Sequence, residues 1–359
     1  MNNTTFRLMA IAIMLLLVFL ASCAHTSTVR DYDGEIIMLE VDERQRVTIN
    51  GIRQRIYLAG AHKESPLLLW LDGGPGGSEV AWVRSYLGAL HTSFTVVCWD
   101  QRGTAGSYRT PKGSLTVHQY VQDVIALSEL LCKQFGQEKI FLVGHSWGSV
   151  IGLLAAQKRA DLYHAYIGAA QHINSMENDA IGWRMILDGA QAQGDGKTVK
   201  RMEKMGPPPY TKVNKDGSVS ADGDAYYQVL KRLYHYSPSA PADRTFSSMK
   251  LFNAPEHTLG SKINLVRGLL RGVKVVYSQL AFLDMEEMVT SIECPLLVVN
   301  SRYDMTCVAS ISERWFDKVE APGKRLLWLE ESGHNGVFTQ PVEFIGFLER
   351  EALPLTCKI

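Results

Sequence analysis

Near-continuous apolar runs alternate with stretches of helical periodicity along much of the chain, and this alternation restricts the fold more than any other feature. Parallel strands that are covered on both faces have this composition, whereas strands with one wet face alternate apolar and polar residues. The runs are PLLLWLD (66–72), FTVVCWD (94–100), KIFLVGHS (139–146), YHAYIGAA (163–170), PLLVVNSRYD (295–304) and KRLLWLEESGH (324–334). In a stretch such as 117–136, apolar residues three and four apart supply one apolar helix face. We therefore predict an α/β protein with a doubly wound, mostly parallel sheet.

Two segments depart from this alternation. Residues 46–60 alternate apolar and polar side chains around Asn50-Gly51, a pair suited to a tight hairpin because both residues accept positive φ. We expect this antiparallel hairpin to open the sheet. Residues 175–292 are rich in Met, Tyr and charged residues and have largely helical patterns, and they are too many for a loop. We predict that they form an inserted helical cap over the strand ends, which leaves 32–174 and 293–359 as the core.

The N-terminus has the layout of a secretory signal. One cation precedes an uninterrupted apolar run of thirteen residues at 8–20, and small residues follow. LASC (20–23) resembles the lipobox of bacterial lipoproteins, in which cleavage precedes a cysteine that carries lipid. We predict a signal peptide at 1–22, a lipidated Cys23 and a polar tether to residue 31. The protein would then be anchored to a bacterial membrane on its secreted side, in the cell envelope. An uncleaved membrane helix is the alternative, although about 17 apolar residues is the lower limit for a span.

Charge and cysteine content exclude several kinds of partner and cofactor. Lys and Arg number 37, as do Asp and Glu, so the chain lacks the basic excess of a nucleic-acid-binding protein, and a small or neutral partner is expected. The six cysteines are irregularly spaced without a C-x-x-C motif, so we predict neither a disulfide framework nor a metal site. Cys98 and Cys132 lie in apolar segments and are expected to be buried thiols, whereas Cys294, Cys307 and Cys357 leave one disulfide possible. The oligomeric state stays open.

A serine between two glycines lies where one predicted strand gives way to a helix, in GHSWG (144–148). A sharp strand-to-helix turn would lift the Ser146 hydroxyl above the carboxyl edge of the sheet, where ligands bind in such folds. Gly144 and Gly148 fit this geometry because a Cβ at either position would collide where strand and helix cross. An ordinary glycine-containing turn is the alternative, and the flanking apolar runs favour the first interpretation. Ser146 is therefore our candidate nucleophile.

A serine nucleophile needs a base and a third group that orients the base. In folds of this class the chain order is Ser, then Asp or Glu, then His. Asp304 directly follows one predicted strand and His334 follows the next, so both fall at the same sheet edge as Ser146. Asp at a strand end is also a common turn residue, but the chain order and the shared edge favour a triad. We predict that Ser146 attacks, His334 transfers the proton and Asp304 orients His334.

A glycine-rich segment, DGGPGG (72–77), follows the first apolar run. It has too little side chain to pack, but it can bring a backbone N–H group close to a substrate carbonyl. We predict an oxyanion hole made by the N–H groups of Gly74 and Trp147. A phosphate-binding loop is the alternative, but no Lys-Ser/Thr pair follows the glycines.

Three blocks, DGGPGG (72–77), WDQRGTAGS (99–107) and GHSWGS (144–149), together resemble the proline iminopeptidase branch of the α/β-hydrolases. The resemblance covers most of the chain apart from the signal and much of the cap. It departs at Asp72, where the family usually has His, and in the second block, which usually reads DQRGSGRS. It implies an α/β-hydrolase fold, catalysis without a cofactor or metal, and an Asp100 and an Arg102 that brace the loops around the site. A solvated pair in a turn is the alternative for these two residues.

The same resemblance implies removal of an N-terminal residue, proline or another small one, from short peptides through an acyl-enzyme. Family aminopeptidases hold the substrate ammonium with acidic cap residues, and Glu177 is our candidate for this role, followed by Glu286 and Glu287. A carboxylesterase that uses the same triad on small esters is one alternative, which the Asp72 departure keeps open. A surface binding protein that has lost the chemistry is another, but no triad residue is missing.

Overall fold

The structure is a computed structural model, and it describes residues 25–217 and 219–357. The predicted signal peptide and Cys23 therefore lie outside the described residues. Within those two ranges, none of the helices combines the length and apolarity that a bilayer span requires.

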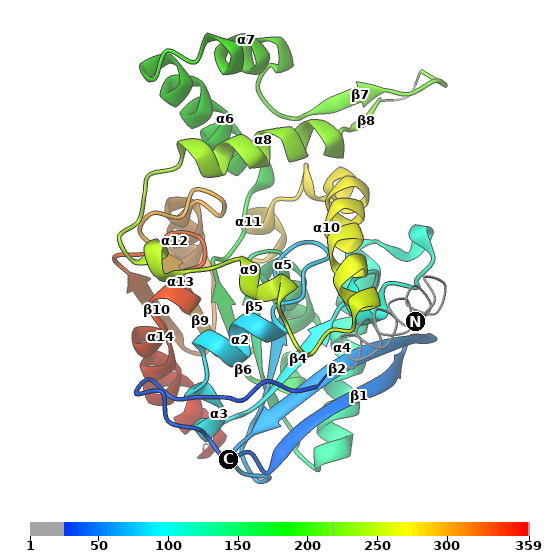
Figure 1. Ribbon diagram of the computed structural model, residues 1–359, viewed down its shortest axis with the longest axis vertical. Helices are drawn as coiled ribbons and strands as arrows, with labels where there is room; N and C mark the ends of the chain where they lie inside the picture. The colour runs from blue at the N-terminus through cyan, green and yellow to red at the C-terminus, as the bar shows by residue number, and fades with distance from the viewer. Residues whose placement is uncertain (1–24, 218, 358–359) are drawn as a thin grey trace, which may run out of the picture.

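An eight-stranded sheet forms the centre of the molecule, in the order β1-β2-β4-β3-β5-β6-β9-β10 (Figure 1). Its strands are β1 (Val41–Ile49), β2 (Ile52–Gly60), β3 (Leu67–Leu71), β4 (Thr95–Asp100), β5 (Ile140–His145), β6 (Tyr163–Ala169), β9 (Leu296–Ser301) and β10 (Lys324–Leu329). The pairs β1–β2 and β2–β4 are antiparallel, and every pair from β4 to β10 is parallel. Asn50 and Gly51 form the turn of the opening hairpin with φ angles of 46° and 77°. The predicted fold class is confirmed.

The apolar runs form the central strands because helices cover both faces of the sheet. Every residue of β3, β4, β5 and β9 is buried. One face packs against α4 (Val117–Phe135), α5 (Trp147–Lys158) and α12 (Ala309–Lys318). The other packs against α2 (Val80–Tyr86), α3 (Leu90–Ser93), α13 (Gly336–Thr339), α14 (Pro341–Phe347) and the turns η5 (Leu348–Ala352) and η6 (Leu353–Cys357). Shorter turns η1 (Ala105–Ser107), η2 (Lys112–Ser114) and η3 (Ala160–Leu162) join these elements.

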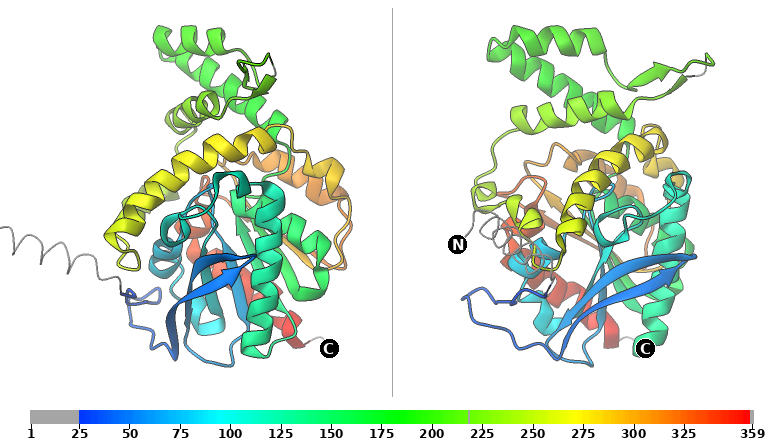
Figure 2. Two further views of the ribbon diagram at one scale, coloured as in Figure 1. Left: turned by 90° about the vertical axis from the view of Figure 1, so that its right-hand side faces the viewer. Right: turned by 45° about the vertical axis from the view of Figure 1, so that its right-hand side comes forward.

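Between β6 and β9 the chain leaves the sheet and builds a layer over the carboxyl ends of the strands (Figures 1 and 2). This inserted segment contains α6 (Ser175–Ala192), α7 (Gly196–Met205), β7 (Thr211–Val213), β8 (Val219–Ala221), α8 (Gly223–Tyr236), η4 (Ala242–Thr245), α9 (Met249–Phe252), α10 (Leu259–Leu280) and α11 (Met285–Met288). The helices α6, α7 and α8 share a small apolar core to which Tyr277 of α10 also contributes. The β7–β8 hairpin lies in a polar, turn-rich stretch at 205–224 that interrupts the helical patterns of the insertion, and it turns at Gly217, whose φ is 82°.

The described part of the predicted tether packs against the inserted segment instead of extending into solvent. The His25 N–H donates to the Pro255 carbonyl at 2.9 Å, and the Ser27 N–H donates to Glu256 Oε1 at 2.8 Å. Val29 is only 1% exposed. This docking could not be predicted from the short polar sequence, because its partners lie more than two hundred residues further along the chain.

Candidate active site

Ser146 lies at the sharp turn between β5 and α5. Its φ is 55° and its ψ is −118°, a left-handed conformation that costs a residue with a side chain about 1–3 kcal/mol. The turn is possible only because two glycines flank it. A Cβ on Gly144 would lie 2.5 Å from the Gly148 carbonyl oxygen, and a Cβ on Gly148 would collide with the Leu71 carbonyl. The steric role predicted for both glycines agrees with this geometry.

The structure brings Ser146, His334 and Asp304 into one hydrogen-bonded chain. His334 Nε2 lies 2.9 Å from Ser146 Oγ, and His334 Nδ1 lies 3.0 and 3.1 Å from the two oxygens of Asp304. When Nδ1 carries the proton and donates to Asp304, Nε2 is left to accept the proton of the serine hydroxyl. The arrangement therefore has the geometry that nucleophilic attack by the Ser146 hydroxyl requires.

The loop that carries Asp304 is held from two sides. Asp304 Oδ1 accepts hydrogen bonds from the N–H groups of Thr306 and Cys307 at 2.8 and 2.9 Å. From α6, the Asn178 side chain donates to the Thr306 carbonyl and accepts from the Val308 N–H, both at 2.8 Å. The inserted segment thus positions the acid of the hydrogen-bonded chain as well as covering it.

Gly74 and Trp147, the predicted oxyanion donors, line the same cavity as Ser146. Neither backbone N–H has an acceptor among the described residues, so both are free to donate. The side chain of Gln101 joins the two segments, since it donates to the Asp72 carbonyl at 3.0 Å and accepts from Trp147 Nε1 at 2.9 Å. This geometry suits an oxyanion hole, and the role of the two N–H groups stays a prediction.

A buried pair that the sequence analysis missed links the glycine-rich loop to the histidine loop. Glu79 accepts hydrogen bonds from the Gly73 N–H at 3.0 Å, from Trp70 Nε1 at 2.8 Å and from His145 Nδ1 at 2.8 Å. His145 Nε2 lies 3.2 Å from the His334 carbonyl. Burial, the largest single influence, lowers the pKa of His145, but the Glu79 carboxylate, the His334 carbonyl and Asp304 together raise it by more, so the net change favours the protonated ring that can donate from both nitrogens. Apart from its place after the glycine-rich segment, nothing in the sequence around Glu79 indicates this role.

Asp100 and Arg102 are buried, at 0% and 2% exposed, and do not form a solvated pair. Asp100 accepts from Ser78 Oγ at 2.6 Å, next to the glycine-rich loop, and Arg102 makes two 2.8 Å bonds to Asp123. Both residues therefore brace loops, and neither lines the cavity.

Asp72, the departure from the usual family block, is fully buried. Neither of its carboxylate oxygens has a hydrogen-bond partner among the described residues. Burial, together with the nearby Glu79, raises the pKa of Asp72 well above its ordinary value and so favours the neutral carboxyl group. It does not contact the cavity.

A cavity of about 750 Å³ lies between the sheet edge and the inserted segment, with Ser146 and His334 in its wall. Most of its lining is aromatic or aliphatic, including Trp82, Val150, Tyr226, Leu230, Phe246, Leu269, Val273 and Tyr277. A site of this kind binds apolar groups and fixes their orientation with a few polar contacts.

Glu177, predicted to hold a substrate ammonium, does not line this cavity. Its carboxylate pairs with Arg314 at 2.6 and 2.9 Å, and this pairing lowers its pKa. Glu286 binds the same arginine at 2.8 Å, and Glu287 is exposed. The structure therefore does not support these three glutamates as amine ligands. For Glu177 the physical reason is its position on α6: residues two apart on a helix point to nearly opposite sides, and Asp179 is the one that lines the cavity.

Asp179 is the inserted segment's carboxylate that does line the cavity, together with Ser175 one helical turn earlier. It is 8% exposed, and its Oδ2 accepts a hydrogen bond from the Tyr277 hydroxyl at 2.9 Å. Burial raises its pKa to about 7, although the Tyr277 bond acts in the opposite direction. The sequence alone does not point to Asp179, because the residues of α6 do not show which side of the helix will face the cavity.

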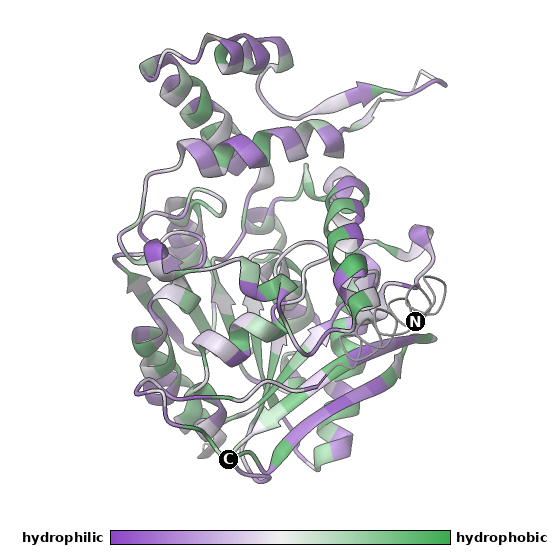
Figure 3. Cartoon of the chain, viewed as in Figure 1, coloured by the Kyte–Doolittle hydropathy of each residue, from purple (hydrophilic) through white to green (hydrophobic). Residues whose placement is uncertain are grey.

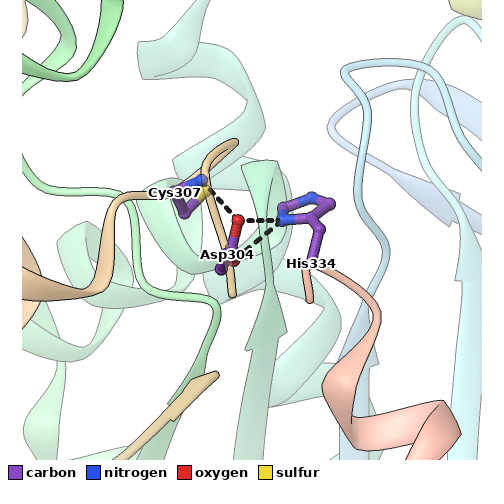
Figure 4. A group of neighbouring side chains, drawn as sticks. All are labelled: Asp304, Cys307 and His334. Carbon is purple, nitrogen blue, oxygen red and sulfur yellow. Dashed lines mark hydrogen bonds and ion pairs between the residues drawn. The ribbon is translucent and has the colours of Figure 1, made fainter. Parts of the chain in front are cut away.

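Cys307 lies beside the hydrogen-bonded chain (Figure 4). Ligand atoms of Asp304, Cys307 and His334 all lie within 4.8 Å of one another. Burial raises the pKa of the Cys307 thiol well above its ordinary value, and Asp304 and His334 already bond each other, so we assign no metal to this group. Cys98, Cys132, Cys294 and Cys307 are free thiols, so a bridge between Cys294 and Cys307 is not formed.

A parallel sheet under a helical layer, with a serine on a strained turn after a central strand and Asp and His after two later strands, defines the α/β-hydrolase class. The chain belongs to the alpha/beta hydrolase family, whose sequence model matches residues 69–347. It is accordingly a hydrolase of this superfamily.

The chain is similar to several proteins along most of its length. "Probable aminopeptidase YbaC" of Bacillus subtilis (strain 168) is 27% identical over 314 residues, which cover 86% of this chain and 95% of the relative. A proline iminopeptidase of Saccharolobus solfataricus is 25% identical over 284 residues, covering 77% of this chain and 82% of the relative. The crystal structure of a proline iminopeptidase from Mycobacterium smegmatis superimposes with a TM-score of 0.57 over 88% of this chain and 100% of that chain. At 15% identity, this last similarity shows the fold alone.

Proposed function

We propose that this protein is a serine hydrolase that removes an N-terminal residue, proline or another small one, from short peptides through an acyl-enzyme. The observation that carries the proposal is the hydrogen-bonded chain of Ser146, His334 and Asp304 in the wall of a cavity that also contains a buried carboxylate, Asp179. The aminopeptidase and proline iminopeptidase relatives support the same reaction class.

The proposed reaction uses each group of the chain in turn. Ser146 Oγ attacks the carbonyl carbon of the substrate while His334 Nε2 takes the hydroxyl proton, and Asp304 stabilises the imidazolium that forms. The N–H groups of Gly74 and Trp147 bind the oxyanion, and one such donor contributes about 10² to 10³ in rate. His334 then gives its proton to the leaving amine, and a water molecule hydrolyses the acyl-enzyme with His334 as the base.

Asp179 binds the substrate ammonium, the role that was predicted from the sequence for Glu177. A substrate ammonium in the cavity would stabilise the ionised carboxylate and lower its pKa, so the free amine and the charged Asp179 would bind as a pair. A substrate with a blocked N-terminus offers no such partner, and the discrimination then comes from polar groups left unpaired in an apolar site. The Tyr277 hydroxyl keeps the carboxylate oriented in both cases.

A carboxylesterase is the second candidate, and the cavity lining favours it. Apart from Asp179 and Glu79, the residues that line the cavity include no acidic side chain, and Glu79 already pairs with His145. An ester with an apolar acyl group would fit such a lining without an ammonium.

Parallel substrate profiling separates the two candidates. The purified protein is assayed on Pro and Ala arylamides, on their N-acetylated counterparts and on short p-nitrophenyl esters, with Ser146→Ala as the control for contaminating activity. An aminopeptidase cleaves the free-amine arylamides and loses most activity after acetylation. Equal cleavage of acetylated and free substrates rules out the aminopeptidase and leaves the esterase.

We also propose that the N-terminus attaches the protein to a bacterial membrane through lipid on Cys23, with the folded part on the secreted side. The support is the LASC sequence and the apolar run at 8–20 before it. We propose no cofactor and no nucleic-acid partner.

A further inference from the structure

One face of α10 is apolar and exposed to solvent. Leu259, Ile263, Val266 and Leu270 are 44%, 47%, 43% and 39% exposed. Their spacing of four, three and four residues places them on one side of the helix, and we call this set the α10 stripe. Figure 3 shows hydrophobic and hydrophilic residues side by side along α10.

Cations border the α10 stripe. The 22 residues of α10 include Lys262, Arg267, Arg271 and Lys274 and no acidic residue. At 100° per residue, Lys262 and Arg267 lie about 70° to either side of the stripe's centre. Neither has an ion-pair partner within the described ranges, whereas Lys274 pairs with Asp224 at 2.6 Å. An apolar stripe between free cations is the pattern of a helix that lies in the headgroup region of an anionic membrane.

The opposite side of α10 packs against the glycine-rich loop (72–77) and against the loop that follows β4. A Cβ on Gly268 would lie 3.0 Å from the Gly103 carbonyl oxygen, and a Cβ on Gly272 would collide with the Pro75 carbonyl oxygen. Gly268 and Gly272 pack tightly on this side of the helix. The stripe lies on the other side and therefore points away from the core. Val266 and Leu270 belong to the stripe and also line the cavity, so the mouth of the cavity lies beside the stripe.

The first described residues lie beside the N-terminal end of α10 (Figure 2). The His25 N–H binds the Pro255 carbonyl, four residues before α10 begins at Leu259. Cys23 is two residues from His25, a distance of at most about 7 Å in extended chain. A membrane attached at Cys23, or reached by the apolar run at 8–20, must therefore lie close to the stripe.

We infer that the α10 stripe rests on the surface of an anionic lipid bilayer and that the cavity opens toward this surface. The inference goes beyond the proposed reaction and rests on the membrane attachment proposed for the N-terminus. Its consequence for the reaction is that amphiphilic substrates held at the lipid surface reach Ser146 directly.

Two other occupants fit the charges less well. A second copy of this face would bring Lys262 and Arg267 of one molecule against the same cations of the other, which is unfavourable. The apolar segment at 8–20 carries no charge that could pair with these cations.

Fluorescence of labelled cysteine variants tests the inference. The full chain carries either Ile263→Cys in the stripe or Ser278→Cys, an exposed position on the same helix about 22 Å further along. Each variant is labelled with a polarity-sensitive thiol fluorophore and reconstituted into vesicles of phosphatidylglycerol and phosphatidylcholine with a lipid-borne quencher. The unsubstituted chain corrects for labelling of native thiols, and hydrolysis of a short ester verifies folding. We expect a blue shift and at least twofold quenching at position 263, little change at position 278, and loss of the effect in Lys262→Glu/Arg267→Glu.

Vesicle flotation keeps the two proposals distinguishable. If the chain floats with the vesicles and position 263 stays as unquenched as position 278, the membrane attachment holds and the inference about α10 is wrong. If the chain does not float and position 263 is unquenched, both proposals fail. A probe at position 263 that is already shielded without lipid shows that the N-terminal segment or a second copy covers the stripe, and this too overturns the inference.

Discussion

Replacement of Asp179 by Asn tests the buried carboxylate by its effect on stability. The pKa of Asp179 is about 7 in the folded protein against an ordinary value of 3.8, because burial penalises the charged form. Between these two values the unfolded chain is ionised and the folded chain holds its proton, so raising the pH favours unfolding. At 1.36 kcal/mol per pKa unit, the loss of stability is about 2 kcal/mol at pH 5 and about 4 kcal/mol at pH 8.

Asp179→Asn removes this penalty while its side-chain oxygen can still accept the Tyr277 hydrogen bond. The unfolding temperature of the variant relative to wild type should therefore increase by a few degrees between pH 5 and pH 8. Differential scanning calorimetry at several pH values measures this difference. Glu177→Gln is the matched control: Arg314 lowers the pKa of Glu177, so its contribution is complete above the ordinary value of 4.5 and does not vary between pH 5 and pH 8.

A difference in unfolding temperature between Asp179→Asn and wild type that is the same at pH 5 and pH 8 would refute the raised pKa.

The same variant also tests the proposed amine site. We expect Asp179→Asn to raise KM for free-amine arylamides at least tenfold and to leave short-ester hydrolysis within about threefold, because an unpaired ammonium in an apolar site costs more than about 1.4 kcal/mol. An unchanged KM removes Asp179 from the amine site.

Ser146→Ala and His334→Ala should each lower turnover by several orders of magnitude, up to about 10⁶, and abolish labelling by a fluorophosphonate probe; wild-type rates in Ser146→Ala would end the triad assignment. Glu79→Gln removes the charge that favours protonated His145, so we expect a loss of about 1–3 kcal/mol in stability and a lower kcat with little change in KM, measured by denaturation and steady-state kinetics. Cys23→Ser should abolish incorporation of labelled fatty acid, and unchanged incorporation would contradict acylation at that position.

Local sequence determined the strands and the position of Ser146, the candidate nucleophile, because these depend on near neighbours. A buried parallel strand needs apolar residues on both faces, and the six runs are visible without any knowledge of their partners. Gly144 and Gly148 flag the sharp turn at Ser146 because only glycine leaves room at that crossing. Chain order then selected Asp304 and His334, because both follow strands of the same parallel sheet.

Tertiary structure alone decided which acidic side chains meet the cavity and which support the loops around Ser146. Glu177 and Asp179 are two residues apart, yet one pairs with Arg314 on α12 and the other faces Ser146's cavity, because the direction of α6 is set by its packing. Glu79 and His145 are 66 residues apart, and their contact exists only once β3 and β5 are paired. The sequence also does not show which apolar residues of α10 are exposed. Its periodicity shows that the helix is amphipathic but not which apolar residues the core covers. Periodicity reports the environment of a residue over a few positions, whereas the identity of a partner depends on contacts that the chain makes only after folding.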